Sequence, residues 1–303
     1  MNYTLNQLKI FLKVVEHASI TKAAEELHLT QPAVSIQLKN FQKNFKYALT
    51  EIINKKLYVT DYGREIANAS EHIINELELI NYKSMGASKQ MAGKLKLSIV
   101  STGKYIMPYF LSGFLNEHPE VDLLMDVTNK SKVISSLEKN EIDFALVSIL
   151  PENILTKQIE LLDNEMYLVG NRELAGDITR NKKSIDSKPF IFRESGSGTR
   201  QMMEKFVSKN KFITKKRIEL TTNEAVKHAV LSGIGISIMP LIGIKTELAT
   251  GEIKIIHTRG LPVKTKWRLI WLKEKKLSPI AAAYIEYLRK NIENIKQLHF
   301  NTL

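Results

Sequence analysis

The residues of this chain best suited to chemistry lie on one face of a short helix expected over residues 31–41, and that chemistry is the reading of DNA bases. Val34, Leu38 and Phe41 recur at helical spacing and can face inward. The other face carries amide, hydroxyl and ammonium groups, which read base edges and hold phosphates. The candidate DNA-binding residues are Thr21, Lys22, Thr30, Gln31, Pro32, Ser35, Gln37, Lys39 and Lys55, with base contacts expected from Gln31, Ser35 and Gln37.

Two short helices joined by a tight turn would present this face, in the layout of a helix-turn-helix. Ser19 and Thr30 can each cap a helix, and Pro32 is tolerated in a first turn because its position has no helical hydrogen bond to lose. Ala23 and Ala24 are small enough for the second helix to cross close by. An ordinary helical hairpin with a solvated polar face is the alternative.

A preceding helix and a following strand favour the DNA-binding interpretation. Apolar residues at helical spacing over 5–17 provide a third helix. A short alternating strand at 57–60 follows Lys55-Lys56 and suggests a basic wing. Residues 1–60 hold eight lysines against four acidic residues, so this segment is more basic per residue than the rest of a chain whose net charge is +12. Such a charge suits a nucleic-acid partner.

A second candidate for chemistry is the loop at residues 194–200, Glu-Ser-Gly-Ser-Gly-Thr-Arg, which joins an expected strand to an expected helix. Its glycines let the backbone approach a ligand, and amides at a helix start with nearby hydroxyls suit an anion. Arg200 is expected to pair with a carboxylate or phosphate, or with Glu194. A flexible Gly-Ser loop is the alternative. The candidate effector-binding residues here are Ser195, Gly196, Ser197, Gly198, Thr199 and Arg200.

Polar residues also follow the expected strands at the points where helices begin. Open α/β sheets bind ligands at the carboxyl ends of their strands, so these residues outline a polar cleft for a small anion. Singly, each is better explained as a helix cap. They are Ser101, Thr102, Asn129, Ser148, Thr222 and Asn223.

The sequence shows no sign of catalysis or of a bound metal. The chain has no cysteine, and none of its seven histidines stands at metal-ligand spacing. No Ser-His-Asp arrangement can be argued, and residues 196–198 lack the spacing of a nucleophile elbow. We therefore expect no metal, no cofactor and no enzyme activity.

The remaining elements suggest a linker followed by an α/β domain. A helix from residue 61 to about 88 carries an apolar stripe that would pair with a second copy, although packing on its own chain is the alternative. From residue 95 onward strands alternate with helices, which predicts a parallel sheet covered on both faces. The candidate dimerisation residues are Ile66, Ile73, Leu77 and Ile80.

At these residues the chain resembles LysR-type transcriptional regulators. The resemblance implies an α/β protein with an N-terminal winged helix-turn-helix (1–60), a linker/dimerisation helix (61–90) and an effector-binding domain (91–303) like two-lobed periplasmic binding proteins. Lobe one would span about 94–163 and 269–303, and lobe two about 164–268. The matching residues are Leu8, Phe11, Val15, Ser19, Ala23, Ala24, Leu27, Thr30, Gln31, Pro32, Ala33, Val34, Ser35, Gln37, Leu38, Thr60 and Gly63.

Several stretches resemble the subgroup that regulates carbon-dioxide-fixation genes, namely 114–119, 140–145, 193–200, 223–235 and 277–279. Other positions depart from the family. Phe41-Gln42 replaces a Leu-Glu pair, Lys46 stands for Gly, and Thr50 and Ile52 lie where Phe and Arg are usual. The missing Arg leaves the wing's phosphate contact to Lys55 and Lys56.

Composition sets the remaining bounds. The chain has 303 residues, 44% of them hydrophobic and 25% charged, as in ordinary globular proteins. It lacks an export signal and any apolar run that could span a bilayer, so we expect a cytoplasmic protein. The expected partners are double-stranded DNA, a small anionic effector, further copies of the chain as dimer or tetramer and, for an activator, RNA polymerase. A plain solute-binding module and an enzyme using the same cleft are the rival functions.

Overall fold

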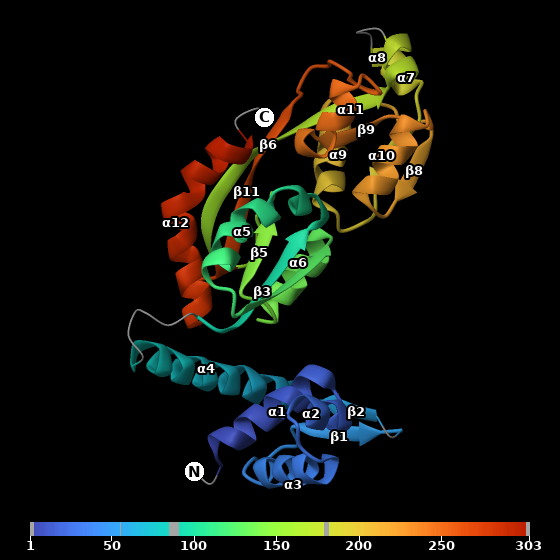
Figure 1. Ribbon diagram of the computed structural model, residues 1–303. Coiled ribbons are helices and arrows are strands. Elements are labelled where there is room, and N and C mark those ends of the chain that lie inside the picture. Colours follow the sequence, from blue (N-terminus) through green and yellow to red (C-terminus); the bar gives the residue numbers. More distant parts are fainter. Residues whose placement is uncertain (1–2, 55, 85–90, 179–181, 301–303) are drawn as a thin grey trace. The chain divides into compact units, whose positions relative to one another are not determined.

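Three helices and a β-hairpin form the N-terminal part of the chain in the computed structural model, which describes residues 3–54, 56–84, 91–178 and 182–300 (Figure 1). The backbone forms two compact units, one within residues 1–89 and 276–279 and the other within 90–275 and 280–303. The first unit contains α1 (Leu5–His17), α2 (Ile20–Glu26), α3 (Gln31–Gln42), β1 (Thr50–Ile53), β2 (Lys56–Val59) and α4 (Asp61–Ser84).

The helix starts expected from the sequence are confirmed. The Ser19 hydroxyl accepts a hydrogen bond from the Lys22 amide at 3.3 Å, and the Thr30 hydroxyl accepts one from the Ala33 amide at 3.4 Å. Each bond satisfies an amide that has no partner inside its helix. These caps fix where α2 and α3 begin and therefore which residues of α3 face outward.

An aromatic cluster holds α3 against α1. Phe11 and Phe41 are fully buried, with ring centroids 5.1 Å apart, and Phe45 packs on Phe41 at 4.9 Å. Buried Ala23 and Ala24 let α2 lie close to both helices. Truncating a buried Phe costs about 3–5 kcal/mol, so this cluster sets the position of the polar face of α3.

The long helix α4 begins where Thr60 accepts a hydrogen bond from the Gly63 amide at 2.9 Å. Ile66 packs against the core of its own unit, so its side chain is already used there. Ile73 and Ile80 are 43% and 60% exposed. Leu77 is half-buried. The part of the predicted helix beyond Ser84 lies outside the described residues.

A seven-stranded mixed sheet forms the framework of the second unit, with strand order β10-β6-β11-β5-β3-β4 and β9 paired to β6. Parallel pairing joins β3 to β4 and to β5. The other pairs are antiparallel, so the expectation of a wholly parallel sheet was wrong. The strands are β3 (Gly93–Val100), β4 (Val121–Thr128), β5 (Phe144–Val147), β6 (Thr156–Asn171), β9 (Ser237–Pro240), β10 (Ile253–Ile255) and β11 (Val263–Leu272).

Two long strands explain the mixed sheet. β6 and β11 pair antiparallel from Val263 opposite Met166 to Leu272 opposite Thr156, with an irregularity after Trp267. They run through the whole unit, so each carries one end in each half of the sheet (Figure 1). Sequence patterns showed only part of each strand, because polar residues interrupt the apolar alternation where the strands pass from one half of the unit to the other.

The two halves of this unit are called lobes here. Lobe one contains β3–β5 with α5 (Met107–Glu117), α6 (Lys130–Glu138), α12 (Pro279–Phe300) and the short helix η1 (Ser101–Tyr105). Lobe two contains β7 (Phe190–Arg193), β8 (Arg217–Leu220), β9 and β10 with α7 (Arg172–Asp177), α8 (Lys182–Asp186), α9 (Gly198–Lys209), α10 (Asn223–Leu231), η2 (Leu241–Gly243) and α11 (Lys245–Ala249). No helix in the described ranges is long and apolar enough to cross a membrane.

Candidate DNA interface and ligand cleft

The outward face of α3 carries most of the polar residues expected there. Gln31, Pro32 and Lys39 are exposed, as are Thr21, Lys22 and Thr30 around the helix starts. Ser35 and Gln37 are half-buried. The Gln37 carbonyl oxygen accepts a hydrogen bond from the Gln7 side chain at 3.1 Å, so contact with a base would require this bond to be shared or exchanged. Lys55 lies outside the described residues.

An apolar residue on this face was missed by the sequence reasoning. Ile36 is 58% exposed, next to Ser35 and one turn before Asn40. An exposed isoleucine between polar residues breaks the helical pattern, and that break is the signal in the sequence. Apolar side chains on a recognition helix contact the methyl group of thymine.

The hairpin expected to act as a wing exposes apolar and aromatic side chains beside Lys56. Ile52 is 70% exposed and Tyr58 49% exposed, while Lys56 is an exposed cation of β2.

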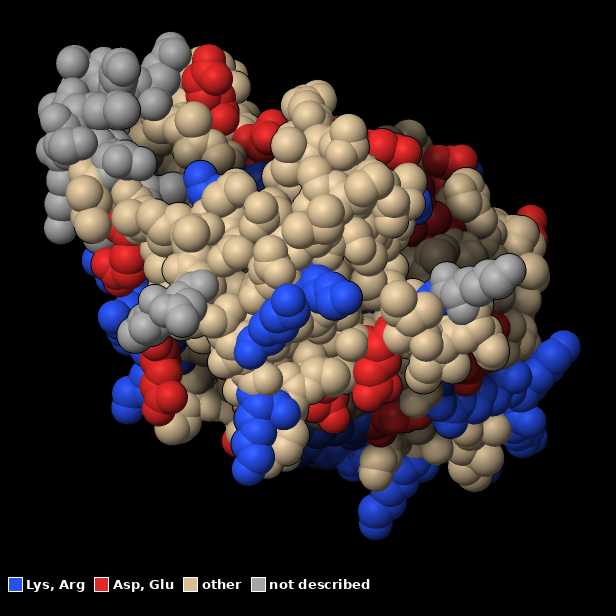
Figure 2. All heavy atoms as spheres, turned by 90° about the horizontal axis from the view of Figure 1, so that it is seen from below, with Lys and Arg blue, Asp and Glu red and all other residues tan. Residues whose placement is uncertain are grey.

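In the face of the molecule seen in Figure 2, Lys and Arg gather over the lower part with Asp and Glu among them. On this face, therefore, the basic residues do not form a single patch that is free of acidic residues.

The polar strand ends predicted to form a cleft do meet between the lobes. A small cavity is lined by Ser101, Thr102, Asn129, Ser148, Ser197, Gly198 and Thr199 together with Lys130. Its volume is about 10 Å³, enough for a single water molecule. In this arrangement, called closed here, the cavity is smaller than a metabolite, and Lys130 and Ser197 also line an open groove of about 590 Å³ beside it.

Three hydroxyl groups at this cavity are available to a ligand. The side chains of Thr102, Ser148 and Thr199 line it and make no side-chain hydrogen bond to another described residue. Thr102 and Ser148 belong to lobe one, and Thr199 belongs to the first turn of α9 in lobe two. A ligand held by these groups would therefore touch both lobes.

Helix starts from both lobes also face the cavity. Asn129 caps α6, where its side-chain oxygen accepts a hydrogen bond from the Lys132 amide at 3.1 Å. Ser197 caps α9 in the same way, accepting from the Arg200 amide at 3.5 Å. Uncapped amides and the helix dipole at such positions favour an anion.

Gly196 of lobe two lies directly against Ser131 of lobe one. Its φ is +84°, and a Cβ placed there would lie 2.6 Å from the Ser131 hydroxyl of α6. The Gly196 carbonyl accepts a hydrogen bond from the Ser131 amide at 3.1 Å. Both the conformation and the contact therefore require glycine here.

A buried arginine that the sequence reasoning did not select holds the lobes together. Arg193, at the end of β7, is 4% exposed and donates to the Ser101 hydroxyl at 3.1 Å and to the Glu194 carboxylate at 2.8 Å. Asn223, also buried, donates to the same Ser101 oxygen at 2.9 Å. Ser101 thus accepts two bonds from lobe two. The signal in the sequence that could have identified Arg193 is its place at the end of an expected strand, next to a glycine-rich loop.

Arg200 lines the open groove beside the small cavity and is held there by bonds within its own lobe. Its guanidinium donates to Glu204 at 2.9 Å, to Glu219 at 2.6 Å and to the Arg193 carbonyl at 3.0 Å. These bonds direct its charge away from the small cavity. Ser195 is exposed beside an adjoining groove, and Thr222 caps α10 by accepting from the Ala225 amide at 3.0 Å.

A second polar contact joins the lobes beyond Ser101. Glu224 of α10 accepts a hydrogen bond from the Tyr105 hydroxyl at 2.9 Å and pairs with Lys104. Burial raises the pKa of the Tyr105 phenol, and the bond to Glu224 raises it further, so the tyrosine stays a donor at physiological pH. The contact belongs to the closed arrangement and would break when the lobes separate.

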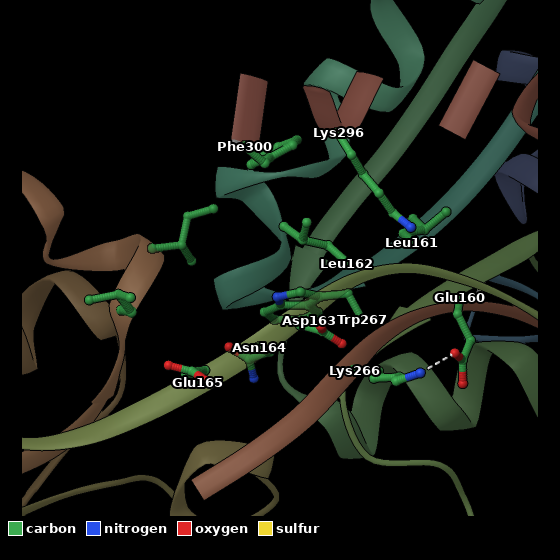
Figure 3. A pocket seen from close by; sticks show the side chains of 12 residues that line it. Glu160, Leu161, Leu162, Asp163, Asn164, Glu165, Lys266, Trp267, Lys296 and Phe300 are labelled. Carbon is green, nitrogen blue, oxygen red and sulfur yellow. Dashed lines mark hydrogen bonds and ion pairs between the residues drawn. The ribbon is translucent and has the colours of Figure 1, made fainter. Parts of the chain in front are cut away.

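A larger cavity of about 420 Å³ lies beside the middle of the paired strands β6 and β11, and Trp267 and Phe300 are among the residues that line it (Figure 3). Three carboxylates line it, from Glu160, Asp163 and Glu165, against the ammonium groups of Lys266 and Lys296. Glu160 already pairs with Lys266 at 2.6 Å. The excess of carboxylates disfavours an anion, so size alone does not make this cavity the anion site.

One histidine lies near two carboxylates within the described part of the first unit. Ligand atoms of Glu16, His17 and Glu26 lie within 4.8 Å of one another. Lys13 already donates to Glu16 at 2.8 Å and pairs with Glu26. The cluster therefore contains its own cation and joins the end of α1 to the end of α2.

Comparison with known families matches both parts of the chain. Residues 5–64 match the bacterial regulatory helix-turn-helix protein model of the lysR family, and residues 88–293 match the LysR substrate binding domain model. The RuBisCO operon transcriptional regulator of Acidithiobacillus ferrooxidans is 37% identical over 289 residues, which cover 94% of this chain and 93% of that protein.

Solved structures agree with the fold. The regulatory domain of CcmR from Synechocystis PCC6803, solved in complex with 2-PG, is 31% identical with a TM-score of 0.62 and covers 67% of this chain and 98% of that one. A full-length OxyR variant from Pseudomonas aeruginosa has a TM-score of 0.74 at 18% identity and covers 98% of this chain and 95% of that one. The second likeness shows the fold alone.

Substitution of Arg193 and of Arg200 should lower the free energy of unfolding of this unit by very different amounts. Arg193→Ala leaves the Glu194 carboxylate without its buried donor, which should lower the free energy of unfolding of this unit by about 3–5 kcal/mol. Arg200→Ala removes half-exposed ion pairs and should cost about 1 kcal/mol or less. Thermal unfolding of the full chain compares the two. Equal losses would contradict the greater energetic weight of the buried Arg193–Glu194 pair.

Proposed function

Because the chain belongs to the LysR family of transcriptional regulators, we propose that α3 reads its operator and that a small anion bound between the lobes controls the response. The observation that carries the ligand class is the cavity at the strand ends. There, unpaired hydroxyls from both lobes meet the starts of α6 and α9. We propose that the boundaries are 1–60, 61–90 and 91–303, with the lobes meeting near residues 163 and 269.

We propose that the ligand is a small phosphorylated acid of the 2-phosphoglycolate type. The relative solved with 2-PG is 31% identical over the corresponding domain. A phosphoryl group carries a charge of about −1.5 to −2 near pH 7 and three acceptor oxygens, which suit hydroxyls and helix-start amides. The relatives named for the RuBisCO operon support a target among carbon-dioxide-fixation genes.

Control would act through separation and closure of the lobes. The ligand has to enter an open arrangement, and once bound it contacts both lobes, so it favours closure around itself. A change in lobe geometry alters the spacing of the DNA-binding units within an assembly of several copies. The cleft then binds its ligand without transforming it, and the protein acts in the cytoplasm, where its DNA lies.

The assembly itself would be built on α4. Ile73 and Ile80 leave a large part of their apolar surface exposed, with half-buried Leu77 between them. A second copy of the helix would cover this stripe. Two such dimers would associate further into a tetramer.

Base contacts from α3 can be tested by single substitutions. Ser35→Ala and Gln31→Ala should each weaken binding to the natural promoter by about 1–3 kcal/mol and leave binding to unrelated DNA unchanged. Ile36→Ser should weaken sites with a thymine at the contacted step. Fluorescence anisotropy with promoter and scrambled duplexes measures this. Wild-type promoter affinity in all three variants would remove the recognition-helix assignment.

The α4 seam predicts a change of assembly. An Ile73→Glu/Leu77→Glu double variant places two charges in the proposed apolar contact, where their burial without partners is costly. Multi-angle light scattering should then report a smaller assembly than for wild type. Glu71→Gln, on the same helix, serves as the control. An unchanged mass for the double variant would mean that another surface holds the copies together.

The cleft is tested by removing a hydroxyl without changing shape. Thr199→Val should weaken 2-phosphoglycolate binding by about tenfold, because a hydrogen bond to a charged ligand contributes about 1.5–3 kcal/mol. Thr250→Val, at the end of α11, should bind as wild type. Calorimetric titration of the full chain gives both affinities. Identical affinities in the two variants would place the ligand elsewhere.

A further inference from the structure

Lys130 occupies a position in the cleft that its neighbours do not share. It is the first residue of α6 and lines both the small interlobe cavity and the open groove of about 590 Å³ beside it. The groove continues along Ser131, Pro151 and Gln201. The Lys130 side chain therefore stands at the junction between the closed site and the route by which solvent reaches it.

The charge on Lys130 has no counter-ion at contact distance. Its ammonium donates to the neutral side-chain oxygen of Gln201 at 3.2 Å. Among the described residues, no carboxylate lies within ion-pair distance of it. Glu152 acts on it from farther away and is opposed by Lys205.

The surroundings of Lys130 disfavour its positive charge. Burial lowers the pKa of its ammonium. The helix dipole adds to this effect, because a cation at the start of α6 faces the positive end of the helix. An anion at this point would relieve both effects at once.

We propose that Lys130 is the residue by which the cleft distinguishes a phosphorylated ligand from its unphosphorylated counterpart. This inference rests on the proposed function and deepens it. The phosphoryl oxygens would take the place of the Gln201 oxygen as acceptors of the Lys130 ammonium, while the hydroxyls of Thr102 and Thr199 bind the same group from either lobe. A ligand with a single carboxylate cannot supply the second negative charge.

The same exchange would connect ligand charge to lobe movement. Lys130 belongs to lobe one and Gln201 to α9 of lobe two, so their hydrogen bond spans the closed cleft. A phosphoryl group placed between them would replace a bond from a charged donor to a neutral acceptor with a bond between opposite charges. An unphosphorylated acid would leave the original bond in place.

The test is a calorimetric titration of the full-length chain with 2-phosphoglycolate, with glycolate measured by competition. Lys130→Gln should weaken 2-phosphoglycolate binding by about tenfold to a hundredfold, the range expected for one lost bond between charged groups. Its effect on glycolate should be much smaller. Lys130→Arg should restore most of the phosphoglycolate affinity, because the charge is retained. Lys205→Gln, which removes the charge of a nearby exposed lysine, should bind 2-phosphoglycolate as the wild type does.

Thermal unfolding midpoints establish that each variant is folded. Wild-type affinity for 2-phosphoglycolate in Lys130→Gln would overturn the role of Lys130 and leave the proposed function standing. Equal losses for 2-phosphoglycolate and glycolate would overturn charge discrimination and assign Lys130 a merely structural part. A wild-type chain that binds neither 2-phosphoglycolate nor inorganic phosphate would overturn the proposed ligand class, and with it this inference.

Discussion

The antiparallel pairing of β6 with β11 is the constraint on which the effector unit depends. These strands pair from Thr156 opposite Leu272 to Met166 opposite Val263 with one register shift after Trp267, so neither lobe can shift along them without breaking a ladder of backbone hydrogen bonds. The lobes can still move relative to each other by bending and twisting of these two strands. The ends of β3 and β5 and the start of α9 are therefore held near one another whether the lobes are open or closed.

Polar contacts, in contrast, close the lobes over the cleft. Arg193 and Asn223 both bond to Ser101, Glu224 bonds to Tyr105, and Lys130 bonds to Gln201. Such a bond contributes about 0.5–1.5 kcal/mol net between neutral groups and about 1.5–3 kcal/mol where one partner is charged, because water replaces it when the lobes separate. Closure of this kind is reversible at modest cost, as a site that admits a metabolite requires.

The sequence predicted local features well and pairings between distant segments poorly. Ser19 and Thr30 cap their helices as expected, because a cap depends only on residues three positions away. The cleft residues from Ser101 to Thr199 meet because strand ends share one edge of a sheet. The full lengths of β6 and β11 were missed, since each pairs with a partner far along the chain. Strand β1 was missed for another reason, because it pairs with β2 directly after it and shows no regular alternation of buried and exposed residues.

The two arginines show the same limit at the level of single side chains. Sequence reasoning chose Arg200 because it ends the Gly-Ser loop, yet Glu204 and Glu219 bind it within lobe two. Arg193 and Lys130 have the charges that face the other lobe. Which of several nearby cations points into a cleft depends on carboxylates brought in by other elements, and a single sequence does not order those.

The left-handed backbone of Gly196 also has a genetic consequence. Any side chain there would strain the turn and push against Ser131, so the lobes would meet imperfectly while α3 and the core of the first unit stayed intact. Such alleles would encode regulators that occupy their promoters but ignore the metabolic state of the cell. Substitutions at codon 196 should therefore separate promoter occupancy from the metabolite response, whereas substitutions at the neighbouring exposed Ser195 should leave the two together.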